Sequence, residues 1–336
     1  MLNKLRAHKR RLILFIKIVF AAILIYLLLH NGMLDLRSIT IVSTRLDLFL
    51  PALLCLFFGI IISGIRWWFL LAITGNKIHL RTVLSLQLIG SFFSAWLPGA
   101  VGGDAIRGIQ IFRLLENGRS TALFSIIADR AFAMFGLVSV AGCATLFLPA
   151  ALIHNAALVG YVNLLKILSW GSGISLVVTL ATIWLVLRFS LLKYAPIRIR
   201  HYLHPIAGAI LTYAKAWPTL ILCAVISSLA SGIVVVGIVL IAEIFTYAAN
   251  PIVTAIAGVF GNLFSVIPIT PGGLGVGESI FSRICTDLSG RAAPFATIYF
   301  IFRAGMLIVN IPGMLISLQY NHAKHRGMAR SNLTSK

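Results

Sequence analysis

The feature that most limits the fold of this chain is a set of apolar runs too long for the core of a soluble protein. Each covers about 18 residues or more, enough for a helix to cross the hydrocarbon core of a bilayer. None alternates apolar and polar residues as the strands of a membrane barrel do. The sequence therefore predicts an all-α polytopic membrane protein with six transmembrane helices, at residues 12–29, 48–73, 121–148, 164–187, 219–242 and 295–318.

Two further apolar runs, at residues 83–97 and 252–267, are only about 15 residues long, which is short for a full crossing. Each leads into a segment rich in Pro and Gly, "WLPGAVGGDAIRG" and "PITPGGLGVGESI". Proline ends a helix and glycine lets the chain reverse its direction, so we expect two re-entrant helical hairpins. Their predicted hinge residues are Pro98, Gly99, Gly102, Gly103, Pro271, Gly272, Gly273 and Gly275.

The net charge of +20 comes from 28 Lys and Arg residues against 8 Asp and Glu residues. The basic residues gather between the apolar runs, as in the cytoplasmic loops of membrane proteins, which argues against nucleic-acid binding. Anionic lipid headgroups are the expected partners of this charge. If the first short arm crossed the membrane, the basic segment at 188–215 would lie outside, against the usual charge bias. Re-entrant arms place that segment and both termini in the cytoplasm.

The two Pro-Gly segments also resemble each other. At an offset of 173 residues Pro98 aligns with Pro271 and Arg130 with Arg303, and one insertion aligns Asp104 with Glu278. These matches predict a duplication with halves at about 48–148 and 219–318, inside one membrane domain at 1–320 that a polar cytoplasmic tail follows at 321–336. Under the topology above the halves form an inverted repeat, an architecture typical of transporters.

Charged residues in or next to apolar segments are costly, and most of them serve a function. Asp104 and Arg107, at i and i+3, share a helix face, either as a structural ion pair or as lining of a headgroup path. Asp129 and Arg130 are sequence neighbours that point apart, so each needs its own partner. The candidate substrate-pathway residues are Asp104, Arg107, Asp129, Arg130, Glu278 and Arg303.

The repeat mates Arg130 and Arg303 can bind phosphate through the rigid donor fork of the guanidinium group. The alternative is that they reach the membrane surface or pair with Asp129 or Glu278. For Glu278, pairing with Arg303 or Arg283 is favoured over a role as a proton carrier.

Arg66, Trp67 and Trp68 lie near the end of the second apolar run, where such residues are typical of a membrane interface. Motifs of hydrolases, nucleotide-binding loops and metalloproteases are missing from the sequence, and the four cysteines are widely spaced. We therefore expect no enzymatic activity, no cofactor and no metal.

The segments "LPGAVGGDAIRG", "ADRAFAMFGL", "TPGGLGVGE" and "YFIFRAG" resemble the membrane region of lysylphosphatidylglycerol synthases. The chain is similar to the stand-alone, flippase-like members of that group, which lack the aminoacyl-transferase domain. The resemblance implies movement of a phospholipid or lipid-linked headgroup between the leaflets of a bacterial or archaeal cytoplasmic (inner) membrane. It does not carry over the synthase activity.

Two other functions stay open. One is a non-transporting membrane partner of a lipid- or glycan-modifying enzyme. The other is a membrane-embedded transferase, for which Asp104 with Asp129 is the candidate acid pair.

Overall fold

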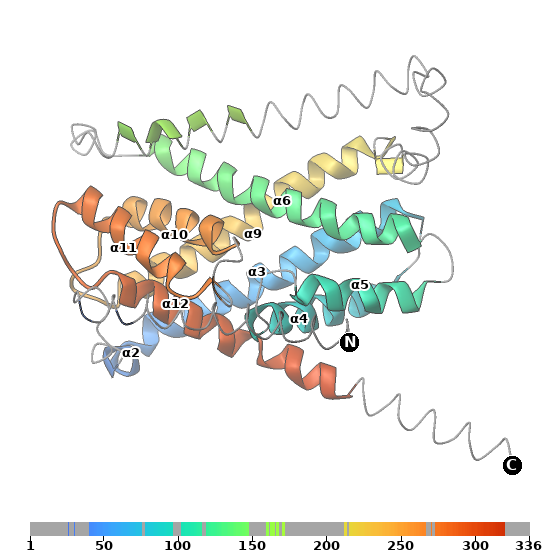
Figure 1. The fold of residues 1–336 in the computed structure, drawn as a ribbon, viewed down its shortest axis with the longest axis horizontal. Helices are drawn as coiled ribbons and strands as arrows, with labels where there is room; N and C mark the ends of the chain where they lie inside the picture. The colour runs from blue at the N-terminus through green and yellow to red at the C-terminus, as the bar shows by residue number, and fades with distance from the viewer. Residues whose placement is uncertain are drawn as a thin grey trace, which may run out of the picture.

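Every regular element in the described part of the chain is an α-helix (Figure 1). The computed structural model describes residues 40–75, 78–96, 102–115, 119–147, 215–266 and 273–319, together with 26, 30, 159–160, 162–164, 166–167, 170–171, 212–213 and 270. The predicted spans at 12–29 and 164–187 fall largely outside these residues, as do the basic segment after them and the tail.

Four helices are long and apolar enough to cross a membrane, and they confirm four of the six predicted spans to within a few residues. They are α3 (Leu46–Ile73), α6 (Arg119–Leu146), α9 (Trp217–Ala242) and α12 (Ala296–Val309), the last continuing as an apolar segment to Gln319. A short helix, α2 (Thr40–Thr44), precedes α3.

Two helical pairs stand where the sequence predicts hairpins. The first is α4 (Leu80–Trp96) with α5 (Gly102–Leu114), and the second is α10 (Pro251–Ser265) with α11 (Val276–Ser289). In the first pair, Gly103 lies against Ser94, and Arg107, one turn later, lies against Gly90, one turn earlier. The partners of this pair therefore run antiparallel. In the second pair Gly273 lies against Ser265 and Gly277 against Gly261, which gives the same result, and the apolar helices α4 and α10 have 17 and 15 residues.

Local signals explain where the second hairpin begins and turns. Asn250 caps α10 by accepting a hydrogen bond from the Ile252 backbone N–H at 2.9 Å, and Pro251 occupies the first helical position. Gly273 and Gly275 have φ values of 73° and 82°, which only glycine adopts without strain. The backbone N–H of Gly275 donates to Glu278 Oε2 at 2.8 Å, and this bond closes the start of α11.

The core forms where α3 crosses α9. Gly59 lies against Val234, and Leu56 and Ala52 lie against Gly237, so residue numbers rise along one helix as they fall along the other. The two helices are thus antiparallel. By the same test α6 runs parallel to α9, because Gly136 contacts Ser227 and Val140 contacts Gly232. Large buried side chains from both halves fill the space between them, including Leu56, Ile238, Phe260, Phe281 and Phe302.

Candidate functional site

A buried charge cluster joins three helices of the first half. Asp129 on α6 accepts from Arg66 of α3 at 2.8 Å through one carboxylate oxygen and from Arg107 of α5 at 3.0 Å through the other. The Asp129 side chain is 5% exposed, and both arginines are similarly buried. A carboxylate in such surroundings stays stable only with charged donors on both oxygens, and this site supplies them.

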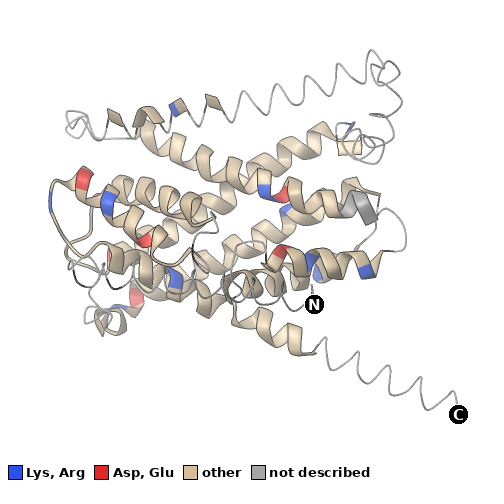
Figure 2. Cartoon of the chain, in the orientation of Figure 1, with Lys and Arg blue, Asp and Glu red and all other residues tan. Residues whose placement is uncertain are grey.

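The cluster continues to a more open end. Asp104, in the first turn of α5, accepts from Arg107 at 3.3 Å and also forms an ion pair with Arg130 of α6. The Arg130 side chain is 36% exposed, the most open member of the cluster. Figure 2 shows acidic and basic residues next to one another on α5 and α6. The described members are three arginines and two aspartates, so the cluster carries one excess positive charge.

These contacts confirm that Asp129 and Arg130 have separate partners. They also show that Arg130 pairs with Asp104, a partner that the sequence did not predict. The i, i+3 pairing of Asp104 with Arg107 is present.

The prediction that Arg66 and Trp67 lie at the membrane interface is wrong. Both side chains are buried by contacts with α5, α6 and α9, and α3 continues about two turns beyond them to Ile73. Arg66 also donates to Ser227 of α9 at 3.2 Å, and Trp67 Nε1 donates to Ser125 at 3.1 Å. The Trp67 ring lies under the Arg107 guanidinium, 3.9 Å from ring centre to Cζ, in a cation–π contact. Trp68 is half-buried and donates to the backbone oxygen of Ile78.

The second half holds a smaller, neutral pair. Arg303 on α12 lies 3.0 Å from Glu278 Oε1, and Glu278 is 2% exposed. Arg303 Nη2 also donates to Ser265 at 2.7 Å and to the backbone oxygen of Gly273 at 2.9 Å. Arg303 therefore fastens the glycine-rich turn to both neighbouring helices. Arg283, the other predicted partner of Glu278, instead pairs with Asp287.

A set of polar side chains that the sequence did not predict lies around Arg303. Tyr299, one turn earlier on α12, donates to Asn262 Oδ1 at 3.0 Å, and its hydroxyl lies 3.3 Å from Ser265 Oγ. The Arg303 guanidinium lies 5.5 Å from the Tyr299 ring centre. The signal available in the sequence was a pair of polar residues, Asn262 and Ser265, inside the short apolar arm.

The two hairpins make the same close contact. A Cβ on Gly90 would lie 3.3 Å from the carbonyl oxygen of Gly103, and a Cβ on Gly261 would lie 3.3 Å from that of Gly277. A serine four residues later, Ser94 or Ser265, lies against the same glycine of the partner helix. The sequence signal was "GSFFS" in the first arm and "GNLFS" in the second.

Of the predicted hinge residues, Gly102 and Gly103 form the start of α5, and Gly273 and Gly275 form the turn before α11. The other four, at Pro98, Gly99, Pro271 and Gly272, lie outside the described residues.

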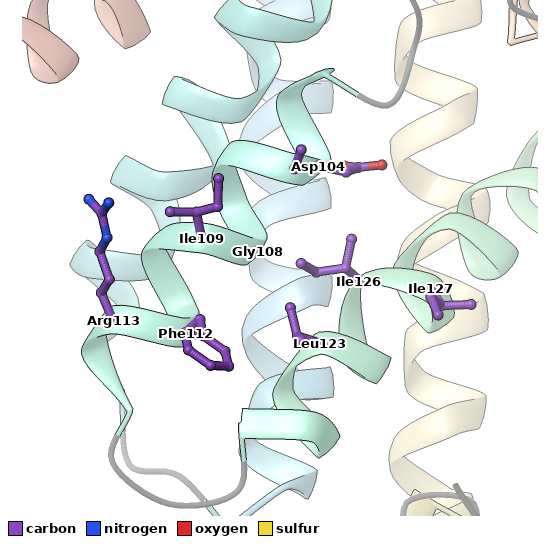
Figure 3. Close-up of a pocket in the computed structure, with 9 residues that line it drawn as sticks. Asp104, Gly108, Ile109, Phe112, Arg113, Leu123, Ile126 and Ile127 are labelled. Atoms are coloured by element: carbon purple, nitrogen blue, oxygen red, sulfur yellow. The ribbon is translucent and has the colours of Figure 1, made fainter. Parts of the chain in front are cut away.

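An apolar groove of about 500 Å³ runs between α5 and α6 beside Asp104 (Figure 3). Its apolar lining includes Ile109 and Phe112 from α5 and Leu123, Ile126 and Ile127 from α6. Asp104 and Arg113 lie toward opposite ends of α5, and the Arg113 side chain extends back along the outer side of that helix to the level of Ile109 (Figure 3).

The sequence profile of the lysylphosphatidylglycerol synthase TM region matches residues 14–313, which is most of the chain. Neither the curated protein sequences nor the solved structures give a significant match. The matched range includes the charge cluster of the first half, the Glu278–Arg303 pair, both hairpins and the groove. On this evidence the chain belongs to the family of the lysylphosphatidylglycerol synthase TM region.

Proposed function

We propose that this protein is a flippase or scramblase that moves a phospholipid or lipid-linked headgroup between leaflets of the cytoplasmic membrane. The observation that carries the proposal is the pair of ion pairs Asp104–Arg130 and Glu278–Arg303, each joining the second helix of a hairpin to the following long helix. Charges inside an apolar bundle are costly, and in membrane proteins they mark the paths of polar substrates. Moving a lipid needs no covalent chemistry, so the proposed activity is transport and not catalysis.

Helix directions support an inverted repeat. The 173-residue offset makes α3 and α9 equivalent, and these two helices pack antiparallel, as equivalent helices of inverted halves must. In Figure 1 the α4–α5 and α10–α11 hairpins lie toward opposite ends of the long helices. This arrangement favours hairpins that enter the membrane from opposite faces. The charge bias of the sequence, and not the packing, predicts both chain termini in the cytoplasm.

In this proposal Arg130 is the first guanidinium to contact the headgroup phosphate. The Arg130 side chain is 36% exposed. The Arg303 side chain is 16% exposed and donates a hydrogen bond to the Gly273 carbonyl oxygen in the turn before α11. Asp104 holds Arg130 until a phosphate replaces the carboxylate. Because a guanidinium binds carboxylate and phosphate with the same donor fork, the exchange needs little rearrangement.

The test is purified protein in liposomes with a headgroup-labelled anionic lipid and a membrane-impermeant quencher. We expect the quenched fraction to rise above half, because label from the inner leaflet reaches the outer one. Liposomes without protein provide the baseline.

The same quenching with and without protein, across several anionic lipids, would reject transport. That result would favour the alternative that the protein docks a lipid- or glycan-modifying enzyme.

A further inference from the structure

We infer that the groove between α5 and α6 binds one anionic phospholipid, with an acyl chain along its walls and the phosphate at Arg113. This inference rests on the proposed function and adds to it the class of lipid and its place of entry. The groove lies beside the charge cluster, so a lipid bound there would be held next to Asp104 and Arg130 before it moves.

The length of the groove fits one leaflet. Asp104 and Arg113 are nine residues apart on α5, which at about 1.5 Å per residue is about 14 Å along the helix. Half of a hydrocarbon core of about 30 Å has nearly the same depth. With Arg113 at the interface, Asp104 lies near the middle of the membrane, as expected for a re-entrant hairpin.

The walls suit an acyl chain. Ile109, Phe112, Leu123 and Ile127 are large apolar residues that remain exposed, and Ile127 is 66% exposed. Figure 3 shows side chains of both helices around the groove. An apolar groove cannot carry a charged headgroup along its length, but it can order the tail beneath one.

Charge selects the headgroup. Arg113 lies in the last turn of α5, and among the described residues no carboxylate forms an ion pair with it. Arg113 therefore favours a lipid with a net negative headgroup over a zwitterionic one.

The experiment measures lipid retained by the purified full-length protein in detergent, by native mass spectrometry. The probes are dioleoylphosphatidylglycerol and dioleoylphosphatidylcholine in equal amounts. We expect the wild-type protein to retain one phosphatidylglycerol in preference to phosphatidylcholine. Ile127→Trp, which fills the groove from an exposed position, should abolish the retained adduct of both lipids.

Arg113→Gln should lower retention of phosphatidylglycerol about fivefold and leave that of phosphatidylcholine unchanged. The control variants are Val225→Trp, on an exposed face of α9, and Arg81→Gln, an exposed arginine at the same end of the first hairpin. Both should retain lipid as the wild-type protein does. A matching elution profile in size-exclusion chromatography shows that each variant is folded.

Wild-type retention in Ile127→Trp would overturn the inference. So would an equal loss in Arg81→Gln and Arg113→Gln, which would indicate a general attraction to basic residues. The liposome assay separates this inference from the proposed function. If retention depends on the groove but the protein does not translocate lipid, transport is rejected and the binding site stands. If the protein translocates lipid but Ile127→Trp retains lipid as the wild type does, the binding site is rejected and transport stands.

Discussion

Arg66 and Asp129 are 63 residues apart in the sequence and form an ion pair of 2.8 Å in the interior of the helix bundle. The pair ties α3 to α6. Arg107 shares the same carboxylate, so the second helix of the first hairpin is tied to both. Asp129 is therefore the only described acid that neutralises Arg66, and it neutralises part of Arg107 as well.

Asp129→Asn should destabilise the protein strongly, because it leaves Arg66 and Arg107 buried with too little negative charge. Removing one partner of a buried pair costs about 3–5 kcal/mol. The measurement is the free energy of unfolding in mixed micelles as the fraction of dodecyl sulfate rises. Asp47→Asn breaks the exposed Arg45–Asp47 pair and should change that free energy by less than about 0.5 kcal/mol. If Asp129→Asn and Asp47→Asn changed the free energy of unfolding equally, burial would not be the cause of the expected destabilisation.

The Glu278–Arg303 pair should show strong coupling in a double-mutant cycle. Glu278→Gln keeps an oxygen that can accept from the Gly275 N–H but leaves Arg303 without its counter-charge. We expect each single change to glutamine to cost about 3 kcal/mol, and the double change to cost about 2 kcal/mol less than their sum. The same unfolding measurement gives all four corners of the cycle. Simple addition of the single effects would show that the two groups do not interact.

Gly103→Ala should destabilise the first hairpin, because the added Cβ would overlap the Gly90 carbonyl oxygen and the Ser94 hydroxyl. Overpacking of this kind costs about 1–3 kcal/mol. Gly232→Ala on α9 is the matched control, since its nearest neighbour would be a Val140 methyl group at 3.8 Å. There the better helix propensity of alanine should leave stability unchanged or raise it by about 0.5–1 kcal/mol. We expect Gly103→Ala to have a lower free energy of unfolding than Gly232→Ala, and the reverse order would refute the prediction.

Arg130→Gln should lower the rate of lipid translocation strongly and lower the free energy of unfolding only slightly. Its side chain is partly exposed, so losing the bond to Asp104 costs less than losing a buried partner. A charged hydrogen bond to phosphate is worth about 1.5–3 kcal/mol, which predicts a translocation rate lower by a factor of about 10 to 150. Arg130→Lys keeps the charge and should retain part of the rate. An unchanged rate in Arg130→Gln at normal expression would remove the phosphate role.

Cysteine labelling should place the ends of the two hairpins on opposite sides of the membrane. In a background without the native cysteines, Arg113→Cys should react with an impermeant maleimide only from the cytoplasmic side. Ala292→Cys, in the exposed connection after α11, should react only from the other side. Reaction of both from the same side would eliminate the inverted arrangement of the hairpins.

Hydrophobic length and glycine position were enough to predict the four described spans and both hairpins. The alignment of Asp104 with Glu278 and of Arg130 with Arg303 also identified residues that form equivalent ion pairs. Such features are local in the sequence, or repeated within it, and they can be found without knowing how the helices pack.

The partners of buried charges could not be found in this way. Arg66 lies seven residues before the end of α3, where an arginine can equally well reach the membrane surface. Only the packing of α6 beside α3 brings Asp129 to it. For the same reason, Arg130 could be predicted to need a partner, but Asp104 became identifiable only from the contact between α5 and α6.

The order of synthesis gives the Asp129 bridge a role in biogenesis. Arg66 and Arg107 leave the ribosome before Asp129, so Arg66 is made before its counter-charge exists, whereas Arg107 already has Asp104 on its own helix. An arginine at the centre of an apolar helix costs about 2.5–3.5 kcal/mol during insertion, and Arg66, seven residues from the end of α3, costs less. Until α6 is made, Arg66 therefore lacks the one described carboxylate that pairs with it, and α6 completes the charge balance of the first half.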